Sequence, residues 1–128
     1  MINYKPDSYN ALPPYLTVDN ARKLVDLLSA IFEAKILRRF DHENGKIAHI
    51  ELKLDDSVIM ISDSTEKYPA NTTMLHFYVP DVFKTFNAAI EKGCKIIEEP
   101  INKDNDPDTR GAFIDYAGNY WAVSTQTI

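Results

Sequence analysis

The two halves of this chain repeat one order of secondary-structure elements, and this duplication constrains the fold more than any other feature of the sequence. In each half a short strand-like run is followed by an amphipathic helical pattern and then by three further strand-like runs. The strands are predicted at residues 15–18, 35–42, 46–54 and 57–63 in the first half, and at 74–79, 95–99, 112–117 and 120–126 in the second. The chain is therefore expected to fold as two β-α-β-β-β modules.

Each half contains one predicted helix, which the spacing of its apolar residues defines. In the first half apolar side chains recur at intervals of three and four over residues 24–32, which places them along one face of a helix. Asp19 or Asn20 is the expected N-cap of this helix. The second helix is predicted from Asp81 to Gly93, because glycine accepts the left-handed conformation that is common just after a helix ends.

Sequence similarity between the halves supports the duplication. The run Leu16-Thr17-Val18-Asp19 corresponds to Phe77-Tyr78-Val79-Pro80, and Ala34-Lys35-Ile36 corresponds to Cys94-Lys95-Ile96, both at an offset of about 60 residues. We predict an α+β fold made of duplicated βαβββ modules. The whole chain, residues 1–128, is expected to form a single domain, with module one at about 10–63 and module two at about 74–126.

Composition excludes several classes of protein. With 14 basic and 19 acidic residues the net charge is −5, so phosphate backbones would on average repel the chain and a nucleic-acid partner is not expected. No apolar run approaches the roughly 20 residues of a membrane span. The first ten residues lack the pattern of a signal peptide and the single cysteine, Cys94, cannot form an internal disulfide, so we expect a cytoplasmic protein without a membrane partner.

Three segments of the sequence carry a resemblance to a known superfamily. They are YNALPPYLTVDNARKLVDLL (Tyr9–Leu28), NGKIAHIELKLDDSVIMISD (Asn44–Asp63) and FIDYAGNYWAVST (Phe113–Thr125). In this order they resemble the glyoxalase/bleomycin resistance/dioxygenase superfamily, the vicinal oxygen chelate proteins, and more narrowly its PhnB-like branch. The resemblance implies a curved mixed sheet in each module, helices on the convex side, and a central cup between the sheets that holds a small molecule or a metal.

The resemblance also implies a divalent metal held by four side chains, one each from the first, fourth, fifth and eighth strands. Such a metal needs imidazole, carboxylate or amide donors. The matched positions are Pro13, Met60, Met74 and Ala122, none of which supplies such a donor. We therefore predict no metal ligands at the usual positions and no cofactor, and a metal-dependent reaction of the usual type is not expected.

His49 and Glu51 lie two residues apart on one predicted strand and are expected to share its polar face. An imidazole beside a carboxylate can act as a general acid and base, so these two are the candidate catalytic residues. Two other interpretations stay open. The pair lines a pocket or forms ion pairs with Lys53 or Arg110, or it binds an atypical divalent metal together with His76.

The candidate ligand-binding residues share the strand parity that is predicted to face the cup. Aromatic rings and methionines with a few polar groups are typical of a site for a flat, partly apolar ligand. These residues are Tyr15, Thr17, Met60, Met74, His76, Tyr78, Phe113, Tyr120 and Ala122. The same surface could instead pack against the opposite sheet or a second subunit. Trp121 has the opposite parity and is expected to be buried under a helix.

Three further features have simple explanations. Cys94 is expected to be a small buried residue rather than a reactive thiol. His42 belongs to a hairpin turn that ends at Gly45 and is expected to be solvated. The segment Asn102–Arg110 is expected to be a connecting loop, with a lid as the alternative.

Two functions are compatible with these observations. The first hypothesis is a binding protein that holds a small organic molecule in a metal-free cup. The alternative is a lyase or isomerase of glyoxalase type, in which His49 and Glu51 act as acid and base or help to hold an atypical divalent metal. On the resemblance alone we expect a homodimer, with modules paired within one chain or across the dimer.

Overall fold

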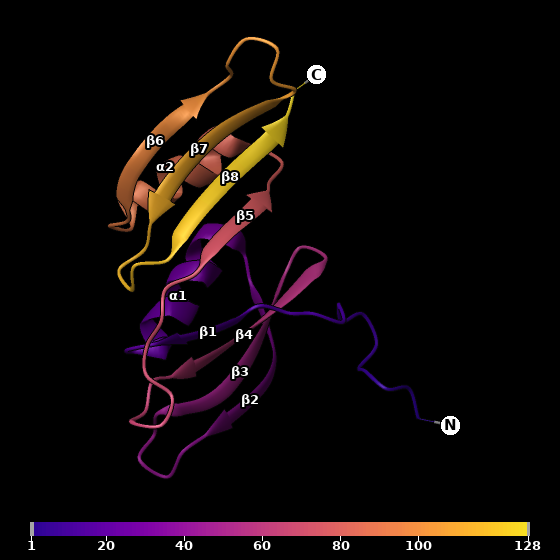
Figure 1. Cartoon of the computed structure of the whole chain (residues 1–128), viewed down its shortest axis with the longest axis vertical. Helices are drawn as coiled ribbons and strands as arrows, with labels where there is room; N and C mark the ends of the chain where they lie inside the picture. The colour runs from indigo at the N-terminus through magenta and orange to yellow at the C-terminus, as the bar shows by residue number, and fades with distance from the viewer. Residues whose placement is uncertain (1, 128) are drawn as a thin grey trace. The chain divides into compact units, whose positions relative to one another are not determined.

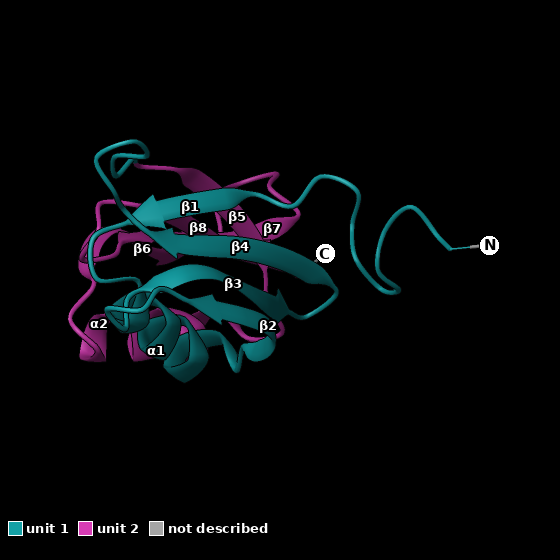
Figure 2. Cartoon of the chain, turned by 90° about the horizontal axis from the view of Figure 1, so that it is seen from below, with its two compact units in different colours: residues 1–71 teal, residues 72–128 magenta. Residues whose placement is uncertain are grey.

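The computed structural model describes residues 2–127, and the chain divides into two compact units, residues 1–71 and 72–128. Each unit holds four strands and one helix in the predicted order, which confirms the repeat (Figures 1 and 2). The first unit contains β1 (Tyr15–Val18), α1 (Ala21–Phe32), β2 (Lys35–Asp41), β3 (Ile47–Leu54) and β4 (Ser57–Asp63). The second contains β5 (Met74–Tyr78), α2 (Val82–Glu91), β6 (Lys95–Ile101), β7 (Asp108–Ile114) and β8 (Tyr120–Gln126).

The two sheets have the same topology. Their strand orders are β1-β4-β3-β2 and β5-β8-β7-β6. In each sheet the first and last strands of the unit pair in parallel, and the other neighbours pair antiparallel. The register also agrees, because Tyr15 pairs with Met60 in the first sheet and His76 pairs with Ala122 in the second. The predicted α+β class with duplicated mixed sheets is therefore confirmed.

In the first unit, α1 packs on one face of the sheet and leaves the other face open. The helix contacts β1, β3 and β4, and Leu24 and Leu28 are fully buried. On β3 the buried Ile50 and Leu52 alternate with residues that point the opposite way. We call that opposite surface the open face of the first sheet; it carries Tyr15, Thr17, Arg38, Phe40, His49, Glu51, Met60 and Ser62.

In the second unit, α2 packs on β6, β7 and β8 (Figure 1). Phe86 of this helix meets Phe113 of β7 in a T-shaped contact with ring centroids 6.4 Å apart. The open face of the second sheet is the surface opposite α2; it carries Met74, His76, Tyr78, Glu98, Arg110, Ala112, Tyr120, Ala122 and Ser124.

The prediction that Phe113 faces away from the helix is wrong. Phe113 is 0% exposed and pairs directly with Trp121, and directly paired residues of neighbouring strands share a face. Trp121 is 1% exposed, and its burial on the helix side is confirmed. The burial of these two rings together makes them a large part of the apolar core of the second unit.

β7 begins four residues before the predicted strand and also ends earlier. Thr109 and Arg110 already pair with β8. After the strand, the Asp115 carboxylate accepts hydrogen bonds from the backbone amides of Ala117 and Asn119, so the chain turns at once. Part of the predicted loop 102–110 is therefore strand.

Each helix start is held by a side chain from the end of the last strand of its unit. Asp63 accepts hydrogen bonds from the amides of Ala21 and Ile47, both at 2.7 Å. In the second unit Thr125 accepts from the amide of Val82 at 2.9 Å and donates to the Val79 carbonyl. Neither helix of the described residues is long and apolar enough to span a bilayer.

The edge strands β2 and β6 both shift register against their neighbours. All seven residues of β2 are exposed. β6 contains Pro100, and its register with β7 shifts between Glu98 and Ile101. Gly111 of β7 allows the close approach of Pro100, because a Cβ atom at Gly111 would lie 3.0 Å from the proline ring.

Candidate functional site

His49 and Glu51 lie side by side on the open face of the first sheet. The Nε2 atom of His49 is 2.8 Å from Oε2 of Glu51. The other carboxylate oxygen accepts a hydrogen bond of 2.5 Å from the hydroxyl of Tyr9, which lies in the segment before β1. The structure therefore brings the two candidate catalytic residues together and adds a third, unpredicted partner.

Tyr15 extends this group of contacts toward the surface. Its hydroxyl lies 3.0 Å from Nδ1 of His49, and its ring is tilted against the imidazole with centroids 5.6 Å apart. Phe40 of β2 lies on the same face, with its ring centroid 6.2 Å from that of His49. Tyr15 is 45% exposed, so this is the end of the group that a dissolved molecule can reach.

Glu51 is a buried carboxylate that its neighbours keep ionised. It is 4% exposed, and burial by itself would raise its pKa. Hydrogen bonds from Tyr9 and His49 and the charges of His49 and Arg38 outweigh burial and hold the pKa of Glu51 below its ordinary value. The guanidinium Nε of Arg38 is 3.8 Å from Oε1. Glu51 is thus a weak base that is suited to orienting His49.

Tyr9 acts as a fixed hydrogen-bond donor to Glu51. Burial raises its pKa, and the hydrogen bond to Glu51 and the negative charge of that carboxylate raise it further. The Arg38 guanidinium lies 5.7 Å from the centre of the Tyr9 ring, within the range of a cation–π contact. Tyr9 therefore stays protonated and keeps one carboxylate oxygen occupied.

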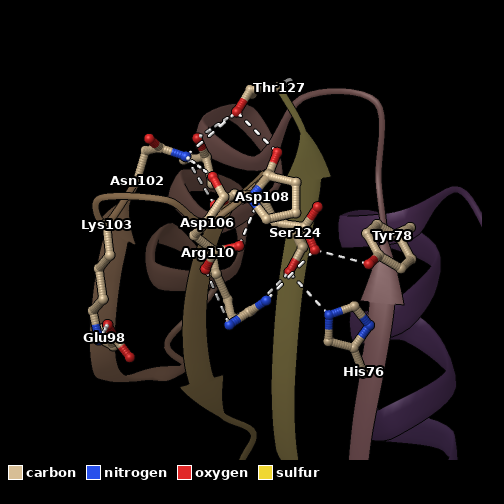
Figure 3. A network of polar contacts seen from close by, with 12 residues as sticks. His76, Tyr78, Glu98, Asn102, Lys103, Asp106, Asp108, Arg110, Ser124 and Thr127 are labelled. Atoms are coloured by element: carbon tan, nitrogen blue, oxygen red, sulfur yellow. Dashed lines mark hydrogen bonds and ion pairs between the residues drawn. The ribbon is translucent and has the colours of Figure 1, made fainter.

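The open face of the second sheet holds a different network (Figure 3). His76 Nε2 lies 2.9 Å from the hydroxyl of the fully buried Ser124, and Arg110 donates to the same oxygen at 3.3 Å. Tyr78 donates to Asp108 at 2.8 Å, a hydrogen bond that raises the pKa of Tyr78. Arg110 is thus engaged within its own unit, where it also forms an ion pair with Asp108.

Eight of the nine predicted ligand-binding residues lie on the open faces, and Phe113 does not. Those on the open faces are Tyr15, Thr17 and Met60 in the first sheet and Met74, His76, Tyr78, Tyr120 and Ala122 in the second. Tyr15, Met74 and Tyr78 are exposed, whereas Thr17 and Ala122 are buried beneath their neighbours. Their role in binding a ligand stays a prediction.

The side chains on β1, β4, β5 and β8, the strands expected to carry metal ligands, do not suit a metal ion. On the open faces of β1, β4, β5 and β8, His76 is the only imidazole or carboxylate side chain of the described strands. Across residues 2–127 no three side chains of His, Cys, Asp or Glu form a group that could hold a metal ion. Met60 and Ala122 stand where carboxylate ligands would be needed, and neither thioether nor methyl is a ligand for a hard cation.

The simple explanations of Cys94 and His42 agree with the structure. Cys94 is buried, and burial, with a contribution from the charge of Asp115, raises the pKa of its thiol to about 11. His42 is exposed beside the hairpin turn at Gly45.

The loop after β6 is fastened by its own side chains. Asn102 donates to the backbone carbonyls of Asp106 and Asp108 (Figure 3). The Asp106 carboxylate accepts from the amide of Asp108 and pairs with Arg110. These bonds favour a connecting loop over a mobile lid.

Two residues of the site, Arg38 and Tyr9, were missed by sequence reasoning. Arg38 had only a partial signal, because the hairpin turn at Asn44-Gly45 predicts that β2 pairs with β3, but a register shift between Phe40 and Asp41 brings Arg38 opposite Glu51. Tyr9 had none, since it lies in a segment without periodicity, 42 residues from its partner.

Comparisons with known proteins agree with the fold. The family model described as the Glyoxalase/Bleomycin resistance protein/Dioxygenase superfamily matches residues 9–123. An uncharacterized protein of Mycobacterium bovis is 26% identical over 133 residues, which cover 95% of this chain and 84% of that protein. TioX from Micromonospora sp. ML1 superposes with a TM-score of 0.77 at 19% identity, covering 92% of this chain and 99% of TioX. The fosfomycin resistance protein FosX of Listeria monocytogenes, solved with Mn(II) and sulfate, gives a TM-score of 0.70 at 14% identity over 93% and 91% of the two chains.

Proposed function

Because the chain belongs to the Glyoxalase/Bleomycin resistance protein/Dioxygenase superfamily, we propose that it binds a small organic molecule on the open faces of its sheets, without the metal site usual in that superfamily. The observation that carries the proposal is the residue set at the matched metal positions. Pro13, Met60, Met74 and Ala122 supply no donor for a divalent cation.

The chemistry of the open faces supports binding of a flat, partly apolar molecule. Exposed aromatic and methionine side chains stand beside a few polar groups with defined partners, as at Tyr15, Met74 and Tyr78. Rings and thioethers supply contact area, and the polar groups orient the ligand. The ligand class we propose therefore combines an apolar ring system with a small number of hydrogen-bonding groups.

A thermal-shift screen tests the binding proposal. Purified protein is mixed with three classes of compound: aromatic antibiotics, phosphonates and glutathione adducts. A ligand at 100 times its Kd stabilises the folded state by about 2.7 kcal/mol, which is a measurable rise in Tm. A Met74→Ala variant should lose part of this shift, whereas Glu91→Gln, on the exposed side of α2, should keep it. No shift with any class would overturn the proposal.

Elemental analysis tests the metal-free part of the proposal separately. We expect no stoichiometric Zn, Ni, Mn or Fe in protein purified without chelator. About one metal per chain, lost in Glu51→Ala or His76→Ala, would contradict the proposal and favour the atypical site.

The second candidate function is a lyase or isomerase of glyoxalase type with His49 and Glu51 as its acid and base. The observation in its favour is the 2.8 Å contact between the two side chains. Its test is turnover of the hemithioacetal of methylglyoxal and glutathione, which is monitored by the absorbance of the thioester product. Loss of turnover in His49→Gln, with the fold retained by circular dichroism, would support this function over simple binding.

Two finer assignments accompany the proposal. We place the chain in the PhnB-like branch on the segments at residues 9–28, 44–63 and 113–125, and we propose a homodimer. Sedimentation at micromolar concentration measures the assembly directly, and a monomer would contradict it.

A further inference from the structure

Three side chains of the first unit form a continuous line of hydrogen bonds from the surface to the interior. The line runs from the hydroxyl of Tyr15 to Nδ1 of His49 at 3.0 Å, and from Nε2 of His49 to Glu51 at 2.8 Å. Exposure falls along it, from 45% at Tyr15 to 4% at Glu51. Only one end of the line is open to a dissolved molecule.

While the imidazole of His49 is neutral, the inner end of the line fixes the direction of every hydrogen bond in it. An ionised carboxylate only accepts hydrogen bonds, and Glu51 is surrounded by the donors Tyr9 and His49 and by the charge of Arg38. His49 must then donate from Nε2. In a neutral imidazole the other nitrogen is an acceptor, so Nδ1 accepts from the hydroxyl of Tyr15.

The outer end of the line therefore presents lone pairs rather than a proton. Because the hydroxyl hydrogen of Tyr15 is committed to Nδ1, the phenolic oxygen can only accept a hydrogen bond from a ligand. The rings of Tyr15 and Phe40 lie against the imidazole and limit its rotation. The half-buried Met60 pairs with both Tyr15 and Glu51, so the surface beside the hydroxyl is apolar.

We infer that Tyr15, His49 and Glu51 form a proton relay that takes a ligand with an acidic hydroxyl, of the phenol or enol class, at the oxygen of Tyr15. This inference rests on the proposed binding function and names the ligand group that the first sheet recognises. The ligand O–H bond breaks as its proton passes to the oxygen of Tyr15, and the proton of Tyr15 passes to Nδ1 of His49. The products are a ligand oxyanion and an imidazolium ion that stays hydrogen-bonded to Glu51, and no oxidant or other reactant is needed.

The first test measures the tautomer of His49 without any ligand. In ¹⁵N-resolved spectra of the histidine rings, His49 should carry its proton on Nε2 and show Nδ1 as a hydrogen-bonded acceptor. Tyr15→Phe should shift the Nδ1 resonance alone, and Glu51→Gln should relax the preference for Nε2–H. His76 in the same spectra serves as the internal control. A neutral His49 protonated on Nδ1 would overturn the relay.

The second test uses two matched probes, 4-nitrophenol and its methyl ether 4-nitroanisole, which lacks the hydroxyl. In a buffer below the pKa of free 4-nitrophenol, binding to the wild-type protein should increase the absorbance band of the phenolate. Tyr15→Phe should weaken binding of 4-nitrophenol about tenfold, as expected for a lost hydrogen bond to a charged partner, and should abolish the spectral change. Binding of 4-nitroanisole should be weaker than that of 4-nitrophenol and should change less than about twofold in the variant.

The outcomes separate the relay from the binding function. Tyr68→Phe, a matched loss of a hydroxyl from an exposed ring outside both open faces, should leave both probes unaffected. Equal binding of the two probes, or a phenolate band that survives Tyr15→Phe, would overturn the relay and leave the binding function standing. Failure of 4-nitrophenol to bind would overturn the relay too, whereas the compound screen decides the binding function independently.

Discussion

The open faces of the two sheets have the same backbone register but carry different side chains at corresponding positions. Reading across the four strands, the first sheet carries Tyr15, Met60, Glu51 and Arg38, and the second carries His76, Ala122, Ala112 and Glu98 at the corresponding positions. The first sheet places a buried carboxylate among donors at its centre. The second places two methyl groups there, with its polar network one row away. The repeated backbone thus places side chains at equivalent positions in the two sheets, but the types of side chain at those positions differ.

The helix faces differ much less than the open faces do. Both are apolar and closely packed, with Leu52 and Ile50 in the first sheet and Phe113 and Trp121 in the second. Truncation of a buried side chain on the helix face should therefore cost far more stability than truncation of an exposed side chain on the open face of the same sheet.

The largest expected effect is at Phe113. Phe113→Ala removes a fully buried ring that meets Phe86, and we expect a loss of about 3–5 kcal/mol in the free energy of unfolding. Met74→Ala, on the open face at 74% exposure, should stay within about 0.5 kcal/mol of wild type. Urea denaturation of both variants measures the difference, and similar losses would show that the face assignment is wrong.

The next effect comes from copying the carboxylate of the first sheet into the second. Ala112→Glu places a carboxylate at a buried position opposite Glu98, without the donors that surround Glu51. We expect a loss of about 2–4 kcal/mol at neutral pH. The loss should shrink as pH falls, because an unpaired buried carboxyl has a raised pKa and is relieved by protonation.

Glu51 should show the opposite dependence on pH. Its folded-state pKa is lowered from the ordinary value of 4.5, so its contribution to stability is present above that value and is lost as pH falls through the lower folded pKa. Glu51→Gln should therefore be less stable than wild type at neutral pH, by about 1–3 kcal/mol, and should flatten the acid limb of the stability curve. Denaturation midpoints from pH 7 to pH 2 check this, with the exposed Glu91→Gln as the variant that should follow wild type.

The smallest effects compare the two helix starts. Asp63→Ala removes an acceptor of two backbone amides, and Thr125→Val removes an acceptor of one. We expect losses of about 1–2 kcal/mol for Asp63→Ala and about 1 kcal/mol for Thr125→Val. Thermal denaturation of the pair decides the order, and a larger loss for Thr125→Val would contradict the assigned roles.

Most of the fold was predictable because apolar periodicity and turn residues act locally. The alternation around His49 and Glu51 identified their shared face. The position of Arg38 opposite Glu51 depends on a register shift between Phe40 and Asp41, which the turn at Asn44-Gly45 does not specify. The parity of Phe113 was missed, since it depends on the register between β7 and β8, which pairs Phe113 with Trp121. The turn between these strands is closed by the side chain of Asp115, which no periodicity reveals.

The contacts of the site that join different strands or segments were not predictable from the sequence. The contact between Tyr9 and Glu51 joins an aperiodic segment to a strand far along the chain, so only tertiary folding creates it. The distance from His49 to Tyr15 depends likewise on β4 lying between their strands, an arrangement that strand patterns do not specify.

Two of the four edge strands, β2 and β6, bear on how the protein avoids aggregation. A strand from another molecule can add to a sheet edge where amides and carbonyls are regularly spaced. In β6 the missing amide hydrogen of Pro100 and the shifted register beside it interrupt that spacing. β2 has no proline, but its Lys35, Arg38 and Arg39 are exposed and would repel the same strand of a second copy. Both of these edges thus discourage amyloid-like growth by a shifted register, to which β6 adds a proline and β2 adds charge.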